Sequence, residues 1–130
     1  MVIPDQFRDI LEAQGFAHWA TIGPDGAPQS NPVWVDFDGE HILVSQTTTR
    51  QKIRNVKRDP RVSLSILDPE NAYRYLEIRG VVTDISIDEG NAFINKMAKK
   101  YFGADEYTFD RPGTQRLVVT IVPKHTTHMG

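Results

Sequence analysis

The chain has 130 residues, with 15 Lys and Arg, 17 Asp and Glu and a formal net charge of −2. This length predicts one domain, residues 1–130, with a single core. The charge disfavours a general nucleic-acid-binding protein, which is normally basic. The absence of cysteine excludes disulfides and thiolate catalysis.

Two features of the sequence bear on location. No apolar run reaches the roughly 20 residues that a membrane-spanning helix needs, so no membrane partner is expected. Residues 1–5 have neither the basic nor the apolar region of a secretory signal. We therefore expect a cytoplasmic protein.

The first part of the chain predicts a short helix followed by strands. Residues 4–14 form the helix, because Phe7, Ile10 and Leu11 make one apolar stripe. Strands are predicted at residues 16–22, 29–37 and 41–45, separated by turn signals at 23–26 and 38–39. Pro32 cannot donate to a ladder, so it marks an edge, a bulge or the wall of a ligand site.

A helix within residues 45–61 follows and ends at Asp59-Pro60. Alternation of apolar residues then predicts strands at residues 61–67 and 73–87, with a bulge or bend at Gly80.

The last part of the chain predicts one more helix and one more strand. Asp88 is the expected N-cap of a helix over residues 89–102. A polar, aromatic loop at 104–114 precedes a strand at 116–122, which Pro123 is expected to end.

These elements predict a mainly β fold. About six short strands at close spacing, with little βαβ rhythm, favour an antiparallel barrel with three flanking helices.

The positive charge is concentrated in residues 45–61, which hold six of the 15 Lys and Arg residues and one carboxylate, Asp59. A helix that begins with hydroxyls and basic side chains offers unpaired amides and charged donors to an anion. Arg50 and Lys52 flank the helix start and can hold one phosphate. A solvated helix face is the alternative, and we assign Lys57, Arg58 and Arg61 to it.

The usual catalytic motifs are absent: the sequence has no GxSxG, HExxH, P-loop or GxGxxG. His125 and His128 are spaced for a weak metal site, but a solvated tail is the better interpretation and no metal is expected. If the protein is an enzyme, a cofactor must carry the chemistry.

Four segments carry a resemblance to a known family: residues 23–26, 29–35, 50–63 and 73–80. Together they resemble the pyridoxamine-phosphate-oxidase-like split β-barrel family, whose fold is the six-stranded antiparallel split β-barrel of the FMN-binding type. Within it, residues 96–103 and Pro112-Gly113 make the chain similar to the branch that uses the deazaflavin coenzyme F420.

The resemblance implies a homodimer with cofactor sites at the subunit interface. Arg50 and Lys52 match the basic pair that binds the cofactor phosphate, and Arg54 is expected to assist an anionic tail. The resemblance implies two further sets of cofactor-binding residues. The strand that lines the ring is matched by Asn31, Pro32, Val33 and Trp34. The strand end and loop between ring and phosphate are matched by Ser45, Gln46, Thr47, Thr48 and Thr49. Tyr73 and Tyr75 match a segment that approaches the site from the partner chain.

The implied activity is hydride transfer from reduced F420 to a small unsaturated organic substrate. Gln51 separates Arg50 from Lys52, whereas flavin-using oxidases have adjacent Arg and Lys, and this departure favours the deazaflavin. An FMN-binding oxidase or reductase and a non-catalytic cofactor carrier or sensor remain alternatives. Tyr73, Tyr75 or water is the source of the proton that must follow the hydride, and no catalytic residue is assigned.

Overall fold

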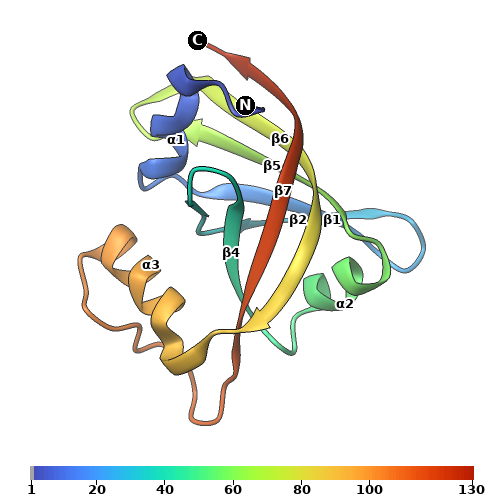
Figure 1. The fold of residues 1–130 in the computed structure, drawn as a ribbon, viewed down its shortest axis with the longest axis vertical. Helices are drawn as coiled ribbons and strands as arrows, with labels where there is room; N and C mark the ends of the chain where they lie inside the picture. Colours follow the sequence, from blue (N-terminus) through green and yellow to red (C-terminus); the bar gives the residue numbers. More distant parts are fainter. Residues whose placement is uncertain (1) are drawn as a thin grey trace.

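The computed structural model describes residues 2–130 (Figure 1). Within these residues the sheet has seven strands: β1 (Ala17–Ile22), β2 (Pro28–Val33), β3 (Asp36–Phe37), β4 (Ile42–Thr47), β5 (Arg61–Asp68), β6 (Asn71–Ile87) and β7 (Arg116–Met129). The helices are η1 (Asp5–Phe7), α1 (Arg8–Glu12), α2 (Gln51–Arg58), η2 (Glu89–Asn91) and α3 (Ala92–Phe102). All strand pairs are antiparallel, which confirms the predicted mainly β fold with flanking helices.

The strand order β2-β1-β5-β6-β7-β4-β3 places two strands that are consecutive in sequence at opposite edges of the sheet. Residues 34–35 join these edges, so the sheet must curl until β2 and β3 adjoin. Pro32 lies in β2 opposite His18, and the prediction of an edge position for this proline is confirmed. The continuous strand predicted over residues 29–37 is wrong, because the chain passes from one edge to the other at Trp34 and Val35. This division accounts for seven strands instead of six.

Side chains of α3 satisfy the backbone of Val35 at this junction. The Val35 N–H donates to the Tyr101 hydroxyl at 3.0 Å, and the Val35 carbonyl accepts from Lys100 Nζ at 2.6 Å. The same two side chains donate to Gly15 O and Leu11 O at 2.8 and 2.6 Å. Burial lowers the pKa of Lys100 and raises that of Tyr101. These bonds replace a sheet ladder and hold α3 against the barrel.

The last strand is longer than predicted. Pro123 does not end it, and β7 continues to Met129 beside β6. Pro123 is opposite Gly80, where the register of β6 shifts. A Cβ at Gly80 would collide with the carbonyl of Val122, so the predicted bulge at Gly80 is confirmed and explains why a proline is tolerated there.

The start of α3 departs from the predicted helix over residues 89–102. Gly90 and Asn91 have positive φ values of 62° and 58°, so the short η2 is separated from α3 by a kink. Asp88 is buried, and its carboxylate accepts from the N–H groups of Phe93 and Ile94 at 2.8 and 2.9 Å. Asp88 therefore caps α3, as predicted, but from beyond the kink.

In Figure 1, α3 and α2 lie on either side of strands β4, β6 and β7. Ile53 and Val56 of α2 are buried in the same core as Trp19 of β1, which confirms the predicted inner face of that helix. The longest helix of residues 2–130 has 11 residues, and none is long and apolar enough to cross a membrane.

We predict that Tyr101→Phe lowers the free energy of unfolding by about 1–3 kcal/mol, because the Val35 N–H and the Gly15 carbonyl lose their partner while the ring stays in place. Urea denaturation measures the change. Tyr73→Phe is the control, since the Tyr73 side chain is exposed, and it should change stability by less than about 0.5 kcal/mol. Equal stability of the two variants would contradict the role of Tyr101 at the junction.

Candidate functional site

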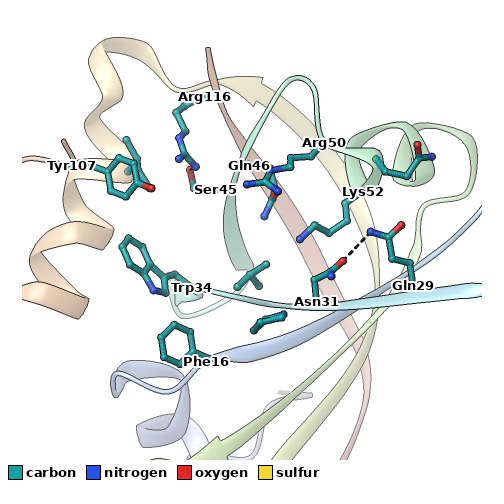
Figure 2. A pocket seen from close by; sticks show the side chains of 14 residues that line it. Phe16, Gln29, Asn31, Trp34, Ser45, Gln46, Arg50, Lys52, Tyr107 and Arg116 are labelled. Atoms are coloured by element: carbon teal, nitrogen blue, oxygen red, sulfur yellow. Dashed lines mark hydrogen bonds between the residues drawn. The ribbon is translucent and has the colours of Figure 1, made fainter. Parts of the chain in front are cut away.

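A cavity of about 540 Å³ opens between α2 and the segment formed by α3 and the loop that follows it (Figure 2). Eight predicted site residues line it: Asn31, Pro32, Val33, Trp34, Ser45, Gln46, Arg50 and Lys52. They come from the edge strand β2, the junction after it, the end of β4 and the start of α2. The curl of the sheet brings these two stretches, residues 31–34 and 45–52, to one hollow.

The remaining predicted residues lie elsewhere. Thr47 and Thr49 line a neighbouring cavity of about 700 Å³, which shares Arg50, Tyr107 and Arg116 with the first. Among residues 2–130, Arg54 lines neither cavity. Its guanidinium donates to Gln51 Oε1 at 2.6 Å and to Thr49 O at 3.2 Å.

Tyr73 and Tyr75 also lie outside both cavities of this chain, as far as residues 2–130 are concerned. Tyr73 is 84% exposed. The intervening Arg74 donates to Asp9 of α1 at 2.7 Å, so this segment packs beside α1 and not beside α2. Any contact of these tyrosines with a site would have to be made with a second chain.

The lining of the first cavity holds three cations, Arg50, Lys52 and Arg116, and no carboxylate among the described residues. Arg116 is neutralised by Asp110, with two hydrogen bonds of 2.8 and 2.9 Å. Neither Arg50 nor Lys52 forms an ion pair within residues 2–130. The cavity therefore has a net positive charge that a bound anion would neutralise.

Lys52 is the more buried of the two free cations, with 7% of its surface exposed. Burial lowers the pKa of its amine, and the charge of Arg50 lowers it further. The face of Trp19, 5.9 Å from Nζ, offers partial compensation. In the described part of the chain no side chain caps the start of α2 at Arg50, so the first amides of the helix can also attract an anion.

Asn55 fixes α2 to the barrel. It is fully buried, and its Nδ2 donates to Thr21 Oγ1 of β1 at 2.9 Å. Its Oδ1 accepts from Gln51 Nε2 at 2.9 Å. This bridge sets the distance of Arg50 and Lys52 from the strands that form the cavity floor.

The opposite wall of the cavity is aromatic. Trp34 stacks on Tyr101 with ring centroids 5.0 Å apart and an interplanar angle of 8°. Tyr107 meets Trp34 edge-on at 5.8 Å, and the Arg116 guanidinium lies 4.8 Å over the Tyr107 ring. Such a wall presents a flat apolar surface to a planar ligand.

Sequence reasoning missed six lining residues: Phe16, Gln29, Gln51, Ile94, Tyr107 and Arg116. Tyr107 lies in the loop identified as aromatic, but nothing local indicates that the loop folds back over β2. The Asp110–Arg116 pair was the available signal, because opposite charges six residues apart can close a loop. Within residues 2–130 no group of three or more His, Asp and Glu residues could hold a metal ion.

Comparisons with known proteins identify the family and the fold. The family model for pyridoxamine 5′-phosphate oxidase matches residues 3–129. A solved structure named F420 reductase is 38% identical, with a TM-score of 0.86, over 96% of this chain and 98% of that one.

Two further structures extend the comparison. A conserved hypothetical protein from Mycobacterium tuberculosis is 29% identical, with a TM-score of 0.75, over 99% of this chain and 86% of that one. General Stress Protein 26 from Bacillus anthracis, 18% identical with a TM-score of 0.72 over 96% and 92% of the two chains, shows the fold alone. The predicted split β-barrel architecture is confirmed.

We predict that Lys52→Met stabilises the free protein at pH 7 by about 0.5–2 kcal/mol, because it keeps the apolar stem and removes an unpaired, desolvated charge. The folded-state pKa of Lys52 is lowered, so protonation favours the unfolded chain. The destabilisation by Lys52 is fully present below the folded-state pKa and is lost as pH rises through it towards 10.5. The advantage of the variant should therefore shrink between pH 7 and pH 10.

Thermal and urea denaturation at the two pH values measure this difference. Lys57→Met is the matched control, because Lys57 is exposed on the same helix and should show neither effect. A Lys52→Met variant that is less stable than the parent at pH 7 would contradict the prediction.

Proposed function

Because the chain belongs to the pyridoxamine 5′-phosphate oxidase family, we propose that it is a coenzyme F420-dependent oxidoreductase that reduces a small unsaturated organic substrate. The observation that carries the proposal is that one cavity pairs a flat aromatic wall with two cations that have no ion-pair partner within residues 2–130. The 38% identity to a protein named F420 reductase supports the choice of cofactor.

The residues present fit such a cofactor. Arg50 and the buried Lys52 supply charge-assisted donors for a phosphate, and their lack of a carboxylate partner in residues 2–130 leaves this role open. The cavity volume of about 540 Å³ lies in the range of small-molecule sites. The neighbouring cavity, lined by Thr47, Thr49 and Arg50, continues from the cations and suits a polar, anionic tail.

When bound, the reduced deazaflavin supplies a hydride for an unsaturated bond of the substrate. The protein's own part is binding and orientation. Arg50 and Lys52 hold the phosphate end, and the β2 residues Asn31 to Val33 line the ring. Trp34 and Tyr107 exclude water from one side of the cavity, which favours a single close approach of substrate.

We extend the proposal to a homodimer in which each site uses both chains. Tyr73 is exposed and Tyr75 is half-buried, and both lie in β6 on either side of Arg74, which pairs with Asp9 of α1. In the dimer, Tyr73 or Tyr75 of the partner subunit would close the site and, like water, could deliver the proton that follows the hydride.

An FMN-dependent oxidase or reductase is the second candidate. It is favoured by the match of residues 3–129 to the pyridoxamine 5′-phosphate oxidase model, whose oxidase members use flavin. Gln51 between Arg50 and Lys52 disfavours it, because those flavin oxidases have adjacent Arg and Lys.

The function is tested by fluorescence titration of the purified protein with F420 and with FMN, side by side. We expect F420 to bind more tightly, and reduced F420 to be oxidised in the presence of an enone or quinone acceptor. Tighter binding of FMN would establish the second candidate. Binding of F420 without turnover across a broad acceptor panel would indicate a carrier.

The same titration tests the phosphate site. Arg50→Ala and Lys52→Met should each weaken F420 binding by about 10–100-fold, since each removes a charge-assisted hydrogen bond of about 1.5–3 kcal/mol. The phosphate-free chromophore 8-hydroxy-5-deazariboflavin should bind all variants equally, and Lys57→Met should bind F420 normally. Unchanged F420 affinity in both site variants would refute the assignment.

The dimeric site is tested by mixing subunits. The protein should elute at about twice the 14.7 kDa of one chain, and the Arg50→Ala and Tyr75→Ala homodimers should each be impaired. Heterodimers of the two variants should regain activity, because one of their two sites is then intact. No recovery in a verified heterodimer would show that Tyr75 does not act across the interface.

A further inference from the structure

We infer that Asn31 presents an N–H donor to the cavity, and that a chain of side-chain amides running from Arg54 through Gln51, Asn55 and Gln29 fixes this orientation. The site would then select a ligand with a hydrogen-bond acceptor, such as a ring carbonyl oxygen, at that edge. The inference rests on the proposed function in taking this ligand to be the ring of the cofactor.

At one end of this series of amides, Arg54 determines the orientation of the Gln51 side-chain amide. Its Nε and Nη2 both donate to Gln51 Oε1, at 3.1 and 2.6 Å. A guanidinium can only donate, so the oxygen of Gln51 must face Arg54. The Gln51 NH₂ is thereby directed at Asn55, and Nε2 lies 2.9 Å from Asn55 Oδ1.

The side-chain amide of Asn55 is oriented in the same sense, with its oxygen towards Gln51 and its NH₂ towards Gln29. Arg58 Nη2 lies 3.4 Å from Asn55 Oδ1, so two donors face this oxygen and its NH₂ must point away from them. Asn55 Nδ2 donates to Thr21 Oγ1 at 2.9 Å and to Gln29 Oε1 at 3.4 Å. Because Asn55 is fully buried, the reversed amide would set donors against donors without water to relieve them.

The orientation of the Gln29 side-chain amide in turn determines that of Asn31 at the cavity. With its oxygen turned to Asn55, its Nε2 donates to Asn31 Oδ1 at 2.8 Å, the bond drawn in Figure 2. The acceptor end of the Asn31 amide is thus occupied, and its NH₂ is the end left for a ligand. Asn31 and Gln29 both line the cavity.

The chemistry of the ligand follows from this arrangement. Three groups that line the cavity near α2 offer only donors to a ligand: the Asn31 NH₂, the Lys52 ammonium and the Arg50 guanidinium. They match an acceptor-rich ring edge linked to a phosphate, and they reject a donor at the same position. Asn31 would touch the ligand, whereas Gln29, Gln51 and Asn55 are positioning residues.

The test is Asn55→Asp, which changes no group in the cavity. The new carboxylate can accept from the Thr21 hydroxyl and from the amides of Gln51 and Gln29, so the buried site stays satisfied. The amide of Gln29 must then turn its NH₂ towards residue 55 and its oxygen towards Asn31. Asn31 in turn donates to Gln29 and shows its oxygen to the cavity.

Two readouts follow this reversal. In the free protein, hydrogen exchange of the Asn31 side-chain NH₂, assigned by NMR, should slow at least threefold because that group becomes hydrogen-bonded. In titrations with F420 and FMN, the cofactor that binds the parent should bind about 10–100-fold more weakly, while the affinity for inorganic phosphate changes by less than about threefold.

Asn31→Ala provides the matched background, since the effect of Asn55→Asp on cofactor affinity should vanish there. Gln29→Glu is a second route to the same reversal, because its carboxylate would accept from both Asn55 and Asn31. Since Gln29 lines the cavity, this variant is read by hydrogen exchange alone, and it replaces Asn55→Asp if that variant does not fold. Two results would overturn the inference. One is unchanged exchange of the Asn31 NH₂ in the folded variant. The other is a loss of cofactor affinity on Asn55→Asp that is as large in the Asn31→Ala background as in the parent. If the parent binds neither cofactor, the proposed function fails, and the exchange measurement still decides the amide chain.

Discussion

The fold depends on the hydrogen bonds made at the short connection between the two edge strands of the barrel. At Val35 the chain leaves β2 and enters β3, and the backbone groups there bond to the hydroxyl of Tyr101 and the amine of Lys100. One helix thereby does three things: it satisfies a buried junction, closes the curl of the sheet and stacks Tyr101 on Trp34. The aromatic wall of the cavity is therefore a by-product of the bonds that hold the barrel together.

The opposite wall follows a similar principle with different chemistry. Asn55 ties α2 to β1 through buried amide and hydroxyl bonds, which places Arg50 and Lys52 at the edge of the hollow. Lys52 is kept there at a cost in stability, since burial without an anionic partner in the described residues disfavours its charged form. An energetically unfavourable group held in place by favourable neighbours is typical of a binding site.

Much of this can be predicted from the sequence, and the reasons differ by feature. Arg50 and Lys52 are predictable because the basic run and the helix start are local, and Pro32 and Gly80 because proline and glycine limit what a strand can do. The family and the barrel fold are predictable from segment order.

The break at Trp34-Val35 is not predictable, because apolar alternation continues through it and its cause lies in α3, far along the chain. For the same reason the sequence does not predict the roles of Asn55, Tyr107 and Arg116, because tertiary packing determines which residues they contact. The role proposed for Tyr73 and Tyr75 involves a second chain, which a single sequence cannot position.

The distribution of charge has a consequence for how fast a ligand finds the cavity. Outside residues 45–61 the chain has nine basic and sixteen acidic residues, so the positive hollow is set in a predominantly negative molecule. An anion approaching at random is repelled by most of the surface and attracted to one region of it. Capture should thus become slower and less selective as salt shortens the reach of these fields to below about 10 Å.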